Sequence, residues 1–548
     1  MITLQCHKLH DVCPFKEKVD KMFSNDFWVL LAILAYFVVV LTIGFVYAKR
    51  SNSSTEEYFL GGRKVGPWLT ALSAEASDMS GYLLMGIPGL AYFTGAADAG
   101  WTVIGLAIGT WANWHFTAKR LRKYSEVASD AITLPDFYSR RLHDDKNIIS
   151  TIAALIILLF FCVYVGSCFV TCGKLFHTLF GIDYMAMMVL GALIVFLYTL
   201  VGGYLSVVVT DFVQGCLMFF ALAVVMIGSI TLASGVENTI SFLQDIPGYF
   251  SLLTNATPQL GSDGNQIVQD AVPVFQSPQS MGVLTIVSYL AWGLGYFGMP
   301  HVLVRFMGIR NADELRKSKY IAVVWVVISM FCAVAIGLIG RVVVPTELLT
   351  NSAAENIFIV LSRMLLPGFM CGVVVSGILA ASMSSASGYL LIAGSSVAED
   401  LYRGVIKKDA TDNQVMIVSR IVLICVFLLG IVIASDENSI IFKVVSFAWA
   451  GLGASFGPLT LCCLYWRRLN KPGAIAGMLT GGISVIAWKY LLSPLGGLFS
   501  IYELLPCFFI ALAVMIIVSL LTPPPEDSVL DEFDHYMDEP MKGVQASA

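Results

Sequence analysis

The amino-acid sequence predicts an all-α membrane protein with about thirteen transmembrane helices. Of its 548 residues 57% are hydrophobic and only 13% are charged, whereas a soluble domain is about half apolar and about a quarter charged. Apolar runs of about 20 residues, the length of a membrane-spanning helix, recur along the chain. The polar stretches between them are short, so we expect one intramembrane domain. The net charge of −5 says little about partners, because each membrane face has its own charge.

The predicted helices follow one another from near the N-terminus, and each has the hydropathy of a membrane span. They lie near residues 27–48, 66–91, 100–119, 149–173, 185–203, 206–233, 281–304, 318–344, 364–397, 415–434, 440–465, 472–491 and 501–521. Residues 1–26 are polar and lack an apolar core before a small-residue site, so we expect no cleavable signal peptide. Cys6 and Cys13, outside the apolar runs, are the two cysteines for which an external disulfide is conceivable.

Positive charges predict the orientation of the chain. Lysine and arginine gather in alternate loops, at Lys49, Arg50, Arg63, Lys64, Lys119, Arg120, Arg122, Lys123, Arg140, Arg141, Lys146, Arg305, Arg310, Arg316, Lys317, Lys319, Arg403, Lys407, Lys408, Arg467, Arg468 and Lys471. The loop 234–280 has neither residue type. Because basic loops face the cytoplasm, we expect segment 1–26 and loop 234–280 outside the cell, although segment 1–26 itself carries lysines. The acidic, proline-led tail 522–548 is then cytoplasmic, and we expect it to be flexible.

The first candidate site is the polar stretch from Ala74 to Gly81, midway through an apolar run. It contains two carboxylates, Glu75 and Asp78, beside two serines. A charge at the bilayer centre costs between about 2.5 and well over 10 kcal/mol unless it faces a partner or a cavity. One interpretation is a carboxylate that neighbouring serines satisfy for packing alone. We favour a broken helix whose free carbonyls and half-helix ends face a small ligand and its coupling cation.

The second candidate site is an interrupted span at residues 288–300. Its glycines match the pattern G-x-G-x-x-G, but a nucleotide site needs that pattern between a strand and a helix of a soluble unit. Close helix packing is one interpretation of these glycines. The proline at position 300 favours the other, an unwound segment in which Trp292 and Tyr296 present their rings to a small ligand.

The two interruptions indicate an internal symmetry. The first opens a set of five helices over residues 66–233, and the second opens another set of five over residues 281–465. An odd number of helices in each set makes the second copy enter the membrane from the opposite face. Interrupted spans at matching positions of two such sets are a sequence sign of a transporter's binding site.

Serines near residue 384 form a third candidate site. Ser384 and Ser385 have hydroxyl oxygens suited to a desolvated alkali cation, and we consider a cage with the carbonyls of Ala76 and Met79. Packing of small residues explains such serines equally well.

Asp211, Tyr164 and the histidines say less about function. Asp211 either caps a helix N-terminus or lines the inner exit of a cation, and the residues favour neither. The hydroxyl of Tyr164 suits a substrate and a helix partner equally. None of the seven histidines forms a pair with metal-ligand spacing, so no transition-metal site is predicted.

Several stretches resemble the sodium/solute symporter family and, within it, the bacterial branch that transports proline. They are Leu60-Gly-Gly-Arg63, Thr70-Ala-Leu-Ser-Ala74, Ala76-Ser-Asp78-Met-Ser80-Gly81, Leu83-Leu-Met-Gly86, Ile132-Thr-Leu-Pro-Asp136, Trp292-Gly-Leu-Gly-Tyr296-Phe-Gly, Ser446-Phe-Ala-Trp-Ala450 and Ser455-Phe-Gly-Pro458. The resemblance runs from about Tyr58 to Leu521. It implies thirteen helices with the five-plus-five inverted-repeat core of the LeuT-like fold. The helix at 27–48 and the two at 466–521 are then additions to that core.

The resemblance also implies site residues. The sodium site would comprise the carbonyls of Ala76, Met79 and Ala381 and the hydroxyls of Ser384 and Ser385, with Asp78 assisting. The substrate site would comprise Ser80, Gly81, Tyr164, Trp292, Tyr296 and Pro300, and Asp211 would lie on the inner sodium route. The chain departs from the family at Glu75, Tyr82 and Met299, where glycine, tryptophan and glutamine are expected. Ser385 stands in place of threonine, which preserves an oxygen ligand.

We therefore expect a secondary active transporter of the cell membrane that couples sodium entry to uptake of L-proline, with no cofactor. Tyr82 and Met299 border the pocket and leave open another small amino or organic acid as the substrate. A cation channel is an alternative of a different class, but its pore would be polar throughout, whereas the polar stretches here are short. An enzyme is disfavoured because no nucleophile–base pair or metal motif is present.

Overall fold

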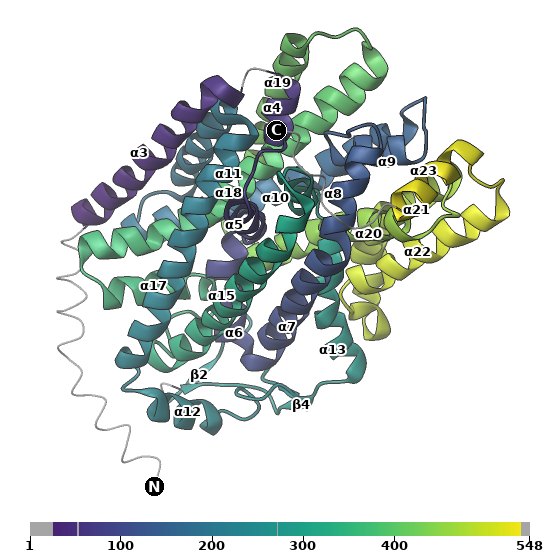
Figure 1. The fold of residues 1–548 in the computed structure, drawn as a ribbon. Coiled ribbons are helices and arrows are strands. Elements are labelled where there is room, and N and C mark those ends of the chain that lie inside the picture. Colours follow the sequence, from purple (N-terminus) through teal and green to yellow (C-terminus); the bar gives the residue numbers. More distant parts are fainter. Residues whose placement is uncertain (1–25, 52–53, 271, 539–548) are drawn as a thin grey trace.

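The computed structural model describes residues 26–51, 54–270 and 272–538 as one helical bundle (Figure 1). Cys6, Cys13 and the rest of segment 1–25 lie outside the described residues, as do residues 539–548. Nine described helices are long and apolar enough to cross a membrane, and a bent helix pair raises that number to ten. Shorter or interrupted helices occupy the other three predicted segments.

The described residues up to Asp245 form helices only. Their elements are α3 (Asp26–Ser51), α4 (Thr55–Leu60), η1 (Gly61–Arg63), α5 (Pro67–Asp78), η2 (Tyr82–Gly86), α6 (Ile87–Thr94), α7 (Ala96–Ala112), η3 (Asn113–Thr117), α8 (Ala118–Val127), α9 (Leu134–Arg141), α10 (Ile148–Phe180), α11 (Tyr184–Leu232) and α12 (Val236–Asp245). Two predicted helices meet within α11 at Gly203, whose φ of 65° is a left-handed value that suits glycine. The backbone therefore kinks where the sequence predicts a connection.

Two short antiparallel strand pairs follow, of which β2 and β3 form a hairpin between β1 and β4. Their strands are β1 (Thr254–Asn255), β2 (Val268–Gln269), β3 (Val272–Pro273) and β4 (Gln279–Ser280). β1 pairs with β4 in the register Thr254↔Ser280, and β2 pairs with β3 in the register Val268↔Pro273. Each strand is only two residues long and lies in the loop 234–280, so the all-α class predicted from the sequence is confirmed.

Helices make up the rest of the described chain, from Val283 onwards. They are α13 (Val283–Leu290), η4 (Ala291–Gly298), α14 (Pro300–Met307), η5 (Ala312–Glu314), α15 (Leu315–Val343), α16 (Asn351–Ala354), α17 (Ile357–Leu365), α18 (Gly368–Ser395), η6 (Ser396–Ile406), α19 (Asp412–Ile433), α20 (Ile441–Tyr465), α21 (Lys471–Ala487), η7 (Trp488–Leu492), η8 (Ser493–Leu495), η9 (Gly497–Ser500), α22 (Leu504–Leu521) and α23 (Asp527–Asp538).

The bundle has two distinct ends (Figure 1). We call the end that carries α12 and the strands the hairpin end. We call the opposite end, where α4, α8 and α9 lie, the basic end, because Arg63, Arg122 and Arg140 are found there. α5 lies inside the bundle in contact with α11, α14, α15 and α18, and every residue from Thr70 to Asp78 is buried. α3, drawn in purple, packs outside against α11 and α18.

The C-terminal tail is not flexible throughout, so that prediction is wrong for residues 527–538. α23 packs against α8 at the basic end. Tyr536 stacks on Tyr124 with ring centroids 4.1 Å apart, and the Arg141 guanidinium lies 4.8 Å from the centre of the Phe533 ring. Arg467 donates two hydrogen bonds of 2.8 and 2.7 Å to the Asp534 carboxylate. Apolar rings and ion pairs together hold this acidic helix on the bundle.

Candidate functional site

The first predicted break is confirmed at the end of α5. Helical winding stops at Met79, whose φ and ψ are −81° and 74°. The Ser80 amide donates to the Asp78 carbonyl at 3.0 Å and not to Ala76, which would be its partner in an α-helix. The chain then resumes as the π-helix η2, which leads into α6. The carbonyl of Ala76 is thereby released from helical hydrogen bonding in the middle of the bundle.

The second predicted break has a different form from the one expected. Residues Ala291–Gly298 stay wound as a 3₁₀-helix, and the chain breaks at Met299, before Pro300 begins α14. The two helical parts differ in direction by 44°. The glycines also pack closely, because a side chain at Gly293 would collide with the backbone of Gly105. The unwound-segment and close-packing interpretations are therefore each correct in part.

Asp78 joins the two breaks. Its carboxylate is fully buried. Oδ2 accepts a hydrogen bond of 2.8 Å from the Tyr296 hydroxyl, and Oδ1 lies 3.3 Å from Nε2 of His301. Both partners belong to the second broken span, so the acid of one break is held by side chains of the other. The alternative in which neighbouring serines satisfy Asp78 is not what the structure contains.

Oxygen atoms gather between α5 and α18. The Ser384 hydroxyl lies 2.7 Å from the Ala76 carbonyl oxygen and 3.1 Å from that of Ala381. The neighbouring Ser385 hydroxyl is fully buried and has no hydrogen-bond partner among the described residues. Clustered neutral oxygens are what a desolvated alkali cation requires. This set of oxygen atoms is therefore suited to sodium. Met79, whose carbonyl is another predicted ligand, is the residue at which the helix breaks.

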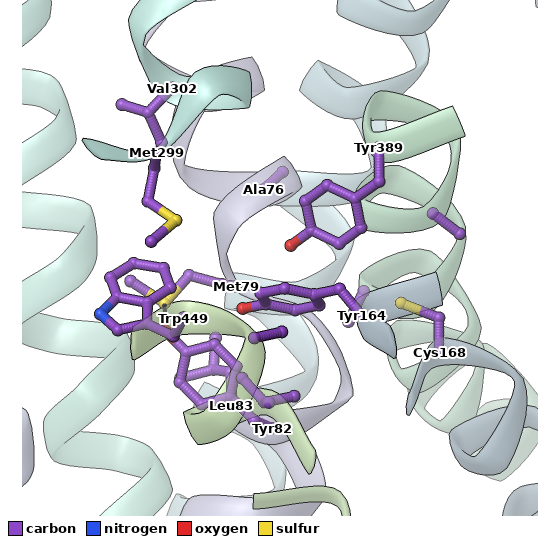
Figure 2. Packing of buried hydrophobic residues seen from close by; sticks show 14 of the residues in the cluster. Ala76, Met79, Tyr82, Leu83, Tyr164, Cys168, Met299, Val302, Tyr389 and Trp449 are labelled. Atoms are coloured by element: carbon purple, nitrogen blue, oxygen red, sulfur yellow. Dashed lines mark hydrogen bonds between the residues drawn. The ribbon is translucent and has the colours of Figure 1, made fainter. Parts of the chain in front are cut away.

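The polar candidates for a substrate pocket lie at the break and on the helices facing it. Ser80 and Tyr164 are fully buried. Tyr164 of α10 and Tyr389 of α18 direct their hydroxyls towards the region of Met79 (Figure 2), and their ring centroids are 4.4 Å apart. Tyr389 donates to the Ser77 carbonyl at 3.1 Å, another carbonyl near the break. A side chain at Gly81 would collide with Thr171 of α10, so glycine lets these elements approach.

Trp292 belongs to an aromatic cluster on the second broken span. Its ring centroid lies 5.1 Å from that of Tyr502 and 5.0 Å from that of Phe442. The Trp292 carbonyl accepts a hydrogen bond of 2.9 Å from the Trp449 indole. Tyr296 stands edge-on to Trp449 at 5.0 Å. Trp292 and Tyr296 therefore share one aromatic wall, and Pro300 lies beyond it at the start of α14.

The three departures from the family pattern surround the same region. The Tyr82 hydroxyl lies 3.0 Å from the Met79 sulfur, and its ring lies 6.3 Å from that of Trp292. Met299 is fully buried and points towards Trp449 (Figure 2). Glu75 is buried one turn before Asp78.

Asp211 lies in a buried ion pair that sequence analysis does not anticipate. Its Oδ2 accepts hydrogen bonds from Nη2 of Arg305 at 3.1 Å and from the Ser73 hydroxyl at 2.7 Å. Arg305 was expected on a cytoplasmic loop. That expectation is wrong, because Arg305 is part of α14 and only 2% exposed. Its Nη1 donates to the His301 carbonyl at 2.7 Å, so Asp211, Arg305, His301 and Asp78 form one connected polar group. Asp211 does not cap a helix.

Sequence reasoning missed four residues of this site: Ser73, His301, Arg305 and Tyr389. A usable signal was present for two of them. His301 and Arg305 are four residues apart, and Arg305 is flanked by Val302-Leu-Val304 and Phe306-Met307. A helix that continued through these apolar neighbours would place both polar side chains on one face, inside the membrane.

Known proteins are similar to this chain in sequence and in fold. Residues 58–481 match the profile described as the Sodium:solute symporter family. The osmoregulated proline transporter OpuE of Bacillus subtilis is 38% identical over 497 residues, which are 91% of this chain and 95% of OpuE. Sodium/proline symporter 2 of Staphylococcus saprophyticus is 39% identical over 510 residues, 92% of this chain and 95% of that protein. A sodium-coupled sialic acid symporter, solved in a substrate-bound outward-open state, superimposes with a TM-score of 0.73 at 20% identity, over 91% of this chain and 99% of that one. This last likeness shows a shared fold.

Proposed function

The chain belongs to the sodium:solute symporter family, and from this membership we propose that it couples sodium entry to the uptake of L-proline. The observation that carries the proposal is the identity of 38–39% over about nine-tenths of the chain to proteins named as proline transporters. The geometry supports it, because a cluster of neutral oxygen atoms adjoins two broken helices in a membrane-spanning bundle. The family transports solutes, and the chain is not an enzyme.

We further propose thirteen membrane spans with the hairpin end outside the cell and the basic end in the cytoplasm. The positive charges of the basic end support this orientation. Segment 1–26 is then extracellular, and the helix at 27–48 precedes the first repeat at 66–233. The loop 234–280, the second repeat at 281–465, the two helices at 466–521 and the cytoplasmic tail at 522–548 complete the chain. The two repeats enter the membrane in opposite directions.

Sodium binds where α5 ends against α18. Its ligands are the carbonyls of Ala76, Met79 and Ala381 and the hydroxyls of Ser384 and Ser385. The hydroxyl proton of Ser384, which faces carbonyl oxygens in this structure, turns away so that the oxygen atoms can face the cation. Asp78 contributes a negative charge one residue before Met79, and the hydrogen bonds from the second broken span hold it in place.

Proline binds between the two breaks, beside sodium. Its carboxylate faces Ser80 and Gly81, where the N-terminal end of the helix formed by η2 and α6 offers free amides and a positive dipole end. Its ring packs against Tyr164, Trp292, Tyr296 and Pro300. Sodium orders the broken end of α5, so each ligand raises the affinity for the other by the same factor.

Access alternates because the pocket is closed in turn from each side. At the basic end, the pair between Arg305 and Asp211 joins α14 to α11, and Ser73 adds α5. Opening this end to the cytoplasm separates these groups, and Asp211 then lines the exit of sodium.

One charge crossing 100 mV releases about 2.3 kcal/mol, and a tenfold sodium gradient adds about 1.4 kcal/mol. Together they accumulate a neutral zwitterion a few hundredfold, at about 1.4 kcal/mol for each factor of ten.

Changing both Ser384 and Ser385 to alanine tests the sodium site. Loss of two oxygen ligands should raise the sodium concentration for half-maximal proline uptake by about tenfold or more, at about 1.4 kcal/mol for each factor of ten. The matched control changes Ser376 and Ser395, buried on the same helix and bonded to carbonyls of that helix. A control pair that alters sodium dependence as strongly would remove the two serines from the site.

Changing Trp292 to alanine tests the substrate pocket. Removal of the ring opens the aromatic wall, and we expect the proline concentration for half-maximal uptake to rise about tenfold, since losing a buried aromatic contact is worth one or more kcal/mol. Trp488→Ala is the control, because that indole bonds to the Phe499 carbonyl away from the breaks. An unaltered proline affinity in Trp292→Ala would show that this ring does not form part of the pocket.

Uptake of labelled proline by proteoliposomes tests the whole proposal. Sodium, lithium and proton gradients are imposed separately, and we expect the sodium gradient to drive accumulation. Competition by other small amino and organic acids identifies the substrate, which matters because Tyr82 and Met299 change the pocket. A substrate that competes better than proline would correct the substrate assignment, and absence of any sodium-driven uptake would contradict the function.

A further inference from the structure

Glu75 is a buried acid that the proposed sodium site does not use. Its side chain is 1% exposed. Oε1 accepts a hydrogen bond of 2.9 Å from the Trp114 indole, whereas Oε2 has no partner within the part of the chain that the structure describes. A carboxylate oxygen that is buried without a partner is costly, more so than a neutral polar atom. A positively charged ligand at this position would satisfy that oxygen.

The π-helical turn whose Trp114 bonds to Glu75 carries further unpartnered polar atoms. Trp114 belongs to η3, a π-helical turn between α7 and α8, and such turns are frequent at functional sites. Asn113, in the same turn, is fully buried, and neither its amide oxygen nor its amide nitrogen has a described partner. The Thr117 hydroxyl, one turn further on, is buried and unpartnered in the same way. Carboxylate, amide and hydroxyl oxygens are hard ligands suited to an alkali cation.

The buried charges near the breaks do not balance. Three buried acids, Glu75, Asp78 and Asp211, lie in this region, and the one buried guanidinium described beside them, that of Arg305, pairs with Asp211, while His301 lies against Asp78. A proline zwitterion adds no net charge, so one sodium ion leaves one negative charge uncompensated in a region of low dielectric. A second monovalent cation would neutralise it.

We propose that Glu75 and Asn113 form a second sodium site, between α5 and η3, and that two sodium ions cross with each proline. The proposal rests on sodium-coupled uptake as the function. Oε2 of Glu75 and the amide oxygen of Asn113 are ligands, and Trp114 is a positioning residue that holds Oε1 of Glu75. With two charges the driving force doubles, and the limiting accumulation rises from a few hundredfold to about 10⁵-fold at equal gradients.

The test is the number of charges that move with each proline, measured from reversal potentials in proteoliposomes. We expect about two charges per proline in the unaltered protein and about one in Glu75→Gln, since each coupled charge adds its own share of the membrane potential. The sodium dependence of uptake should change from sigmoidal to hyperbolic in the same variant. Asp263→Asn, which alters an exposed loop acid, is the control and should keep the unaltered ratio.

Trp114→Phe provides a second measurement that retains the acid. It removes the indole donor from Oε1 and keeps an aromatic ring against Phe306. We expect the charge ratio to persist while the sodium requirement rises about tenfold, because Oε1 loses a hydrogen bond made to a charged group.

Three results would overturn the second site. One is a ratio of one charge per proline in the unaltered protein, which decides the matter even if Glu75→Gln fails to fold. Another is an unchanged ratio in Glu75→Gln. The third is a reversal potential that follows an imposed pH gradient, because the second ion would then be a proton. Loss of sodium-driven uptake in the unaltered protein would instead contradict the proposed function itself, so the two failures are distinguishable.

Discussion

Replacing Asp78 by asparagine should raise the sodium concentration for half-maximal proline uptake by at least about tenfold, at about 1.4 kcal/mol for each factor of ten. The amide has the shape of the carboxylate, so packing around the break is preserved. It lacks the negative charge, and only its oxygen accepts hydrogen bonds, whereas the carboxylate has one oxygen for Tyr296, at 2.8 Å, and another for His301, at 3.3 Å. A hydrogen bond to a charged group is worth about 1.5–3 kcal/mol, against about 0.5–1.5 kcal/mol for a neutral pair.

Tyr296→Phe is the control for Asp78→Asn. It removes one hydrogen bond to the carboxylate and leaves the charge, so the sodium requirement should rise less than in Asp78→Asn. Uptake is measured over a range of sodium concentrations at saturating proline. If Asp78→Asn lowers the maximal rate but leaves sodium dependence unchanged, Asp78 has no part in cation binding.

Replacing Arg305 by methionine should destabilise the folded protein by about 3–5 kcal/mol, because removing one partner of a buried ion pair leaves the other charge uncompensated. The charge left behind is that of Asp211, which is 0% exposed and would keep Ser73 as its one described donor. Methionine fills much of the volume of arginine, so the cavity contribution is small. Thermal unfolding of purified protein in detergent measures the change.

The double variant with Arg305→Met and Asp211→Asn should recover most of that stability. Both charges are then absent, and replacing a whole buried ion pair by uncharged groups often changes the free energy of unfolding only slightly. The recovery measures the coupling between the two residues, which we expect to exceed about 1 kcal/mol for groups in direct contact. If the double variant is no more stable than Arg305→Met, the pair is not what holds this end of the bundle.

The case of Arg305 shows why sequence analysis misplaced a residue of the site. An arginine near the end of an apolar run is ordinarily one whose side chain extends to the membrane surface. The apolar residues that follow, Phe306 and Met307, allow a helix that continues around it, but they do not require one. What distinguishes the two arrangements is Asp211, 94 positions away in the sequence.

The tail illustrates the opposite situation, because the pattern that predicts its helix lies within the local sequence. Val529, Phe533 and Tyr536 recur at spacings of four and three residues, which places them on one face of a helix. The prolines before Glu526 and the acidic composition favour a flexible tail instead. In the structure these three side chains are buried.

Much of the fold was determined by the sequence alone. The positions of the membrane spans and of both breaks follow from local physics, because hydrocarbon thickness sets helix length and every backbone group inside a bilayer needs a partner. The family resemblance selected the residues of the site. The contacts among them were decided by tertiary structure. Tyr296 meets Asp78 across 218 positions and Ser384 meets Ala76 across 308, and such contacts depend on how helices far apart in the chain pack together. The same holds for the unpartnered oxygen of Glu75, since the sequence shows an acid and only the packed neighbours show what it lacks.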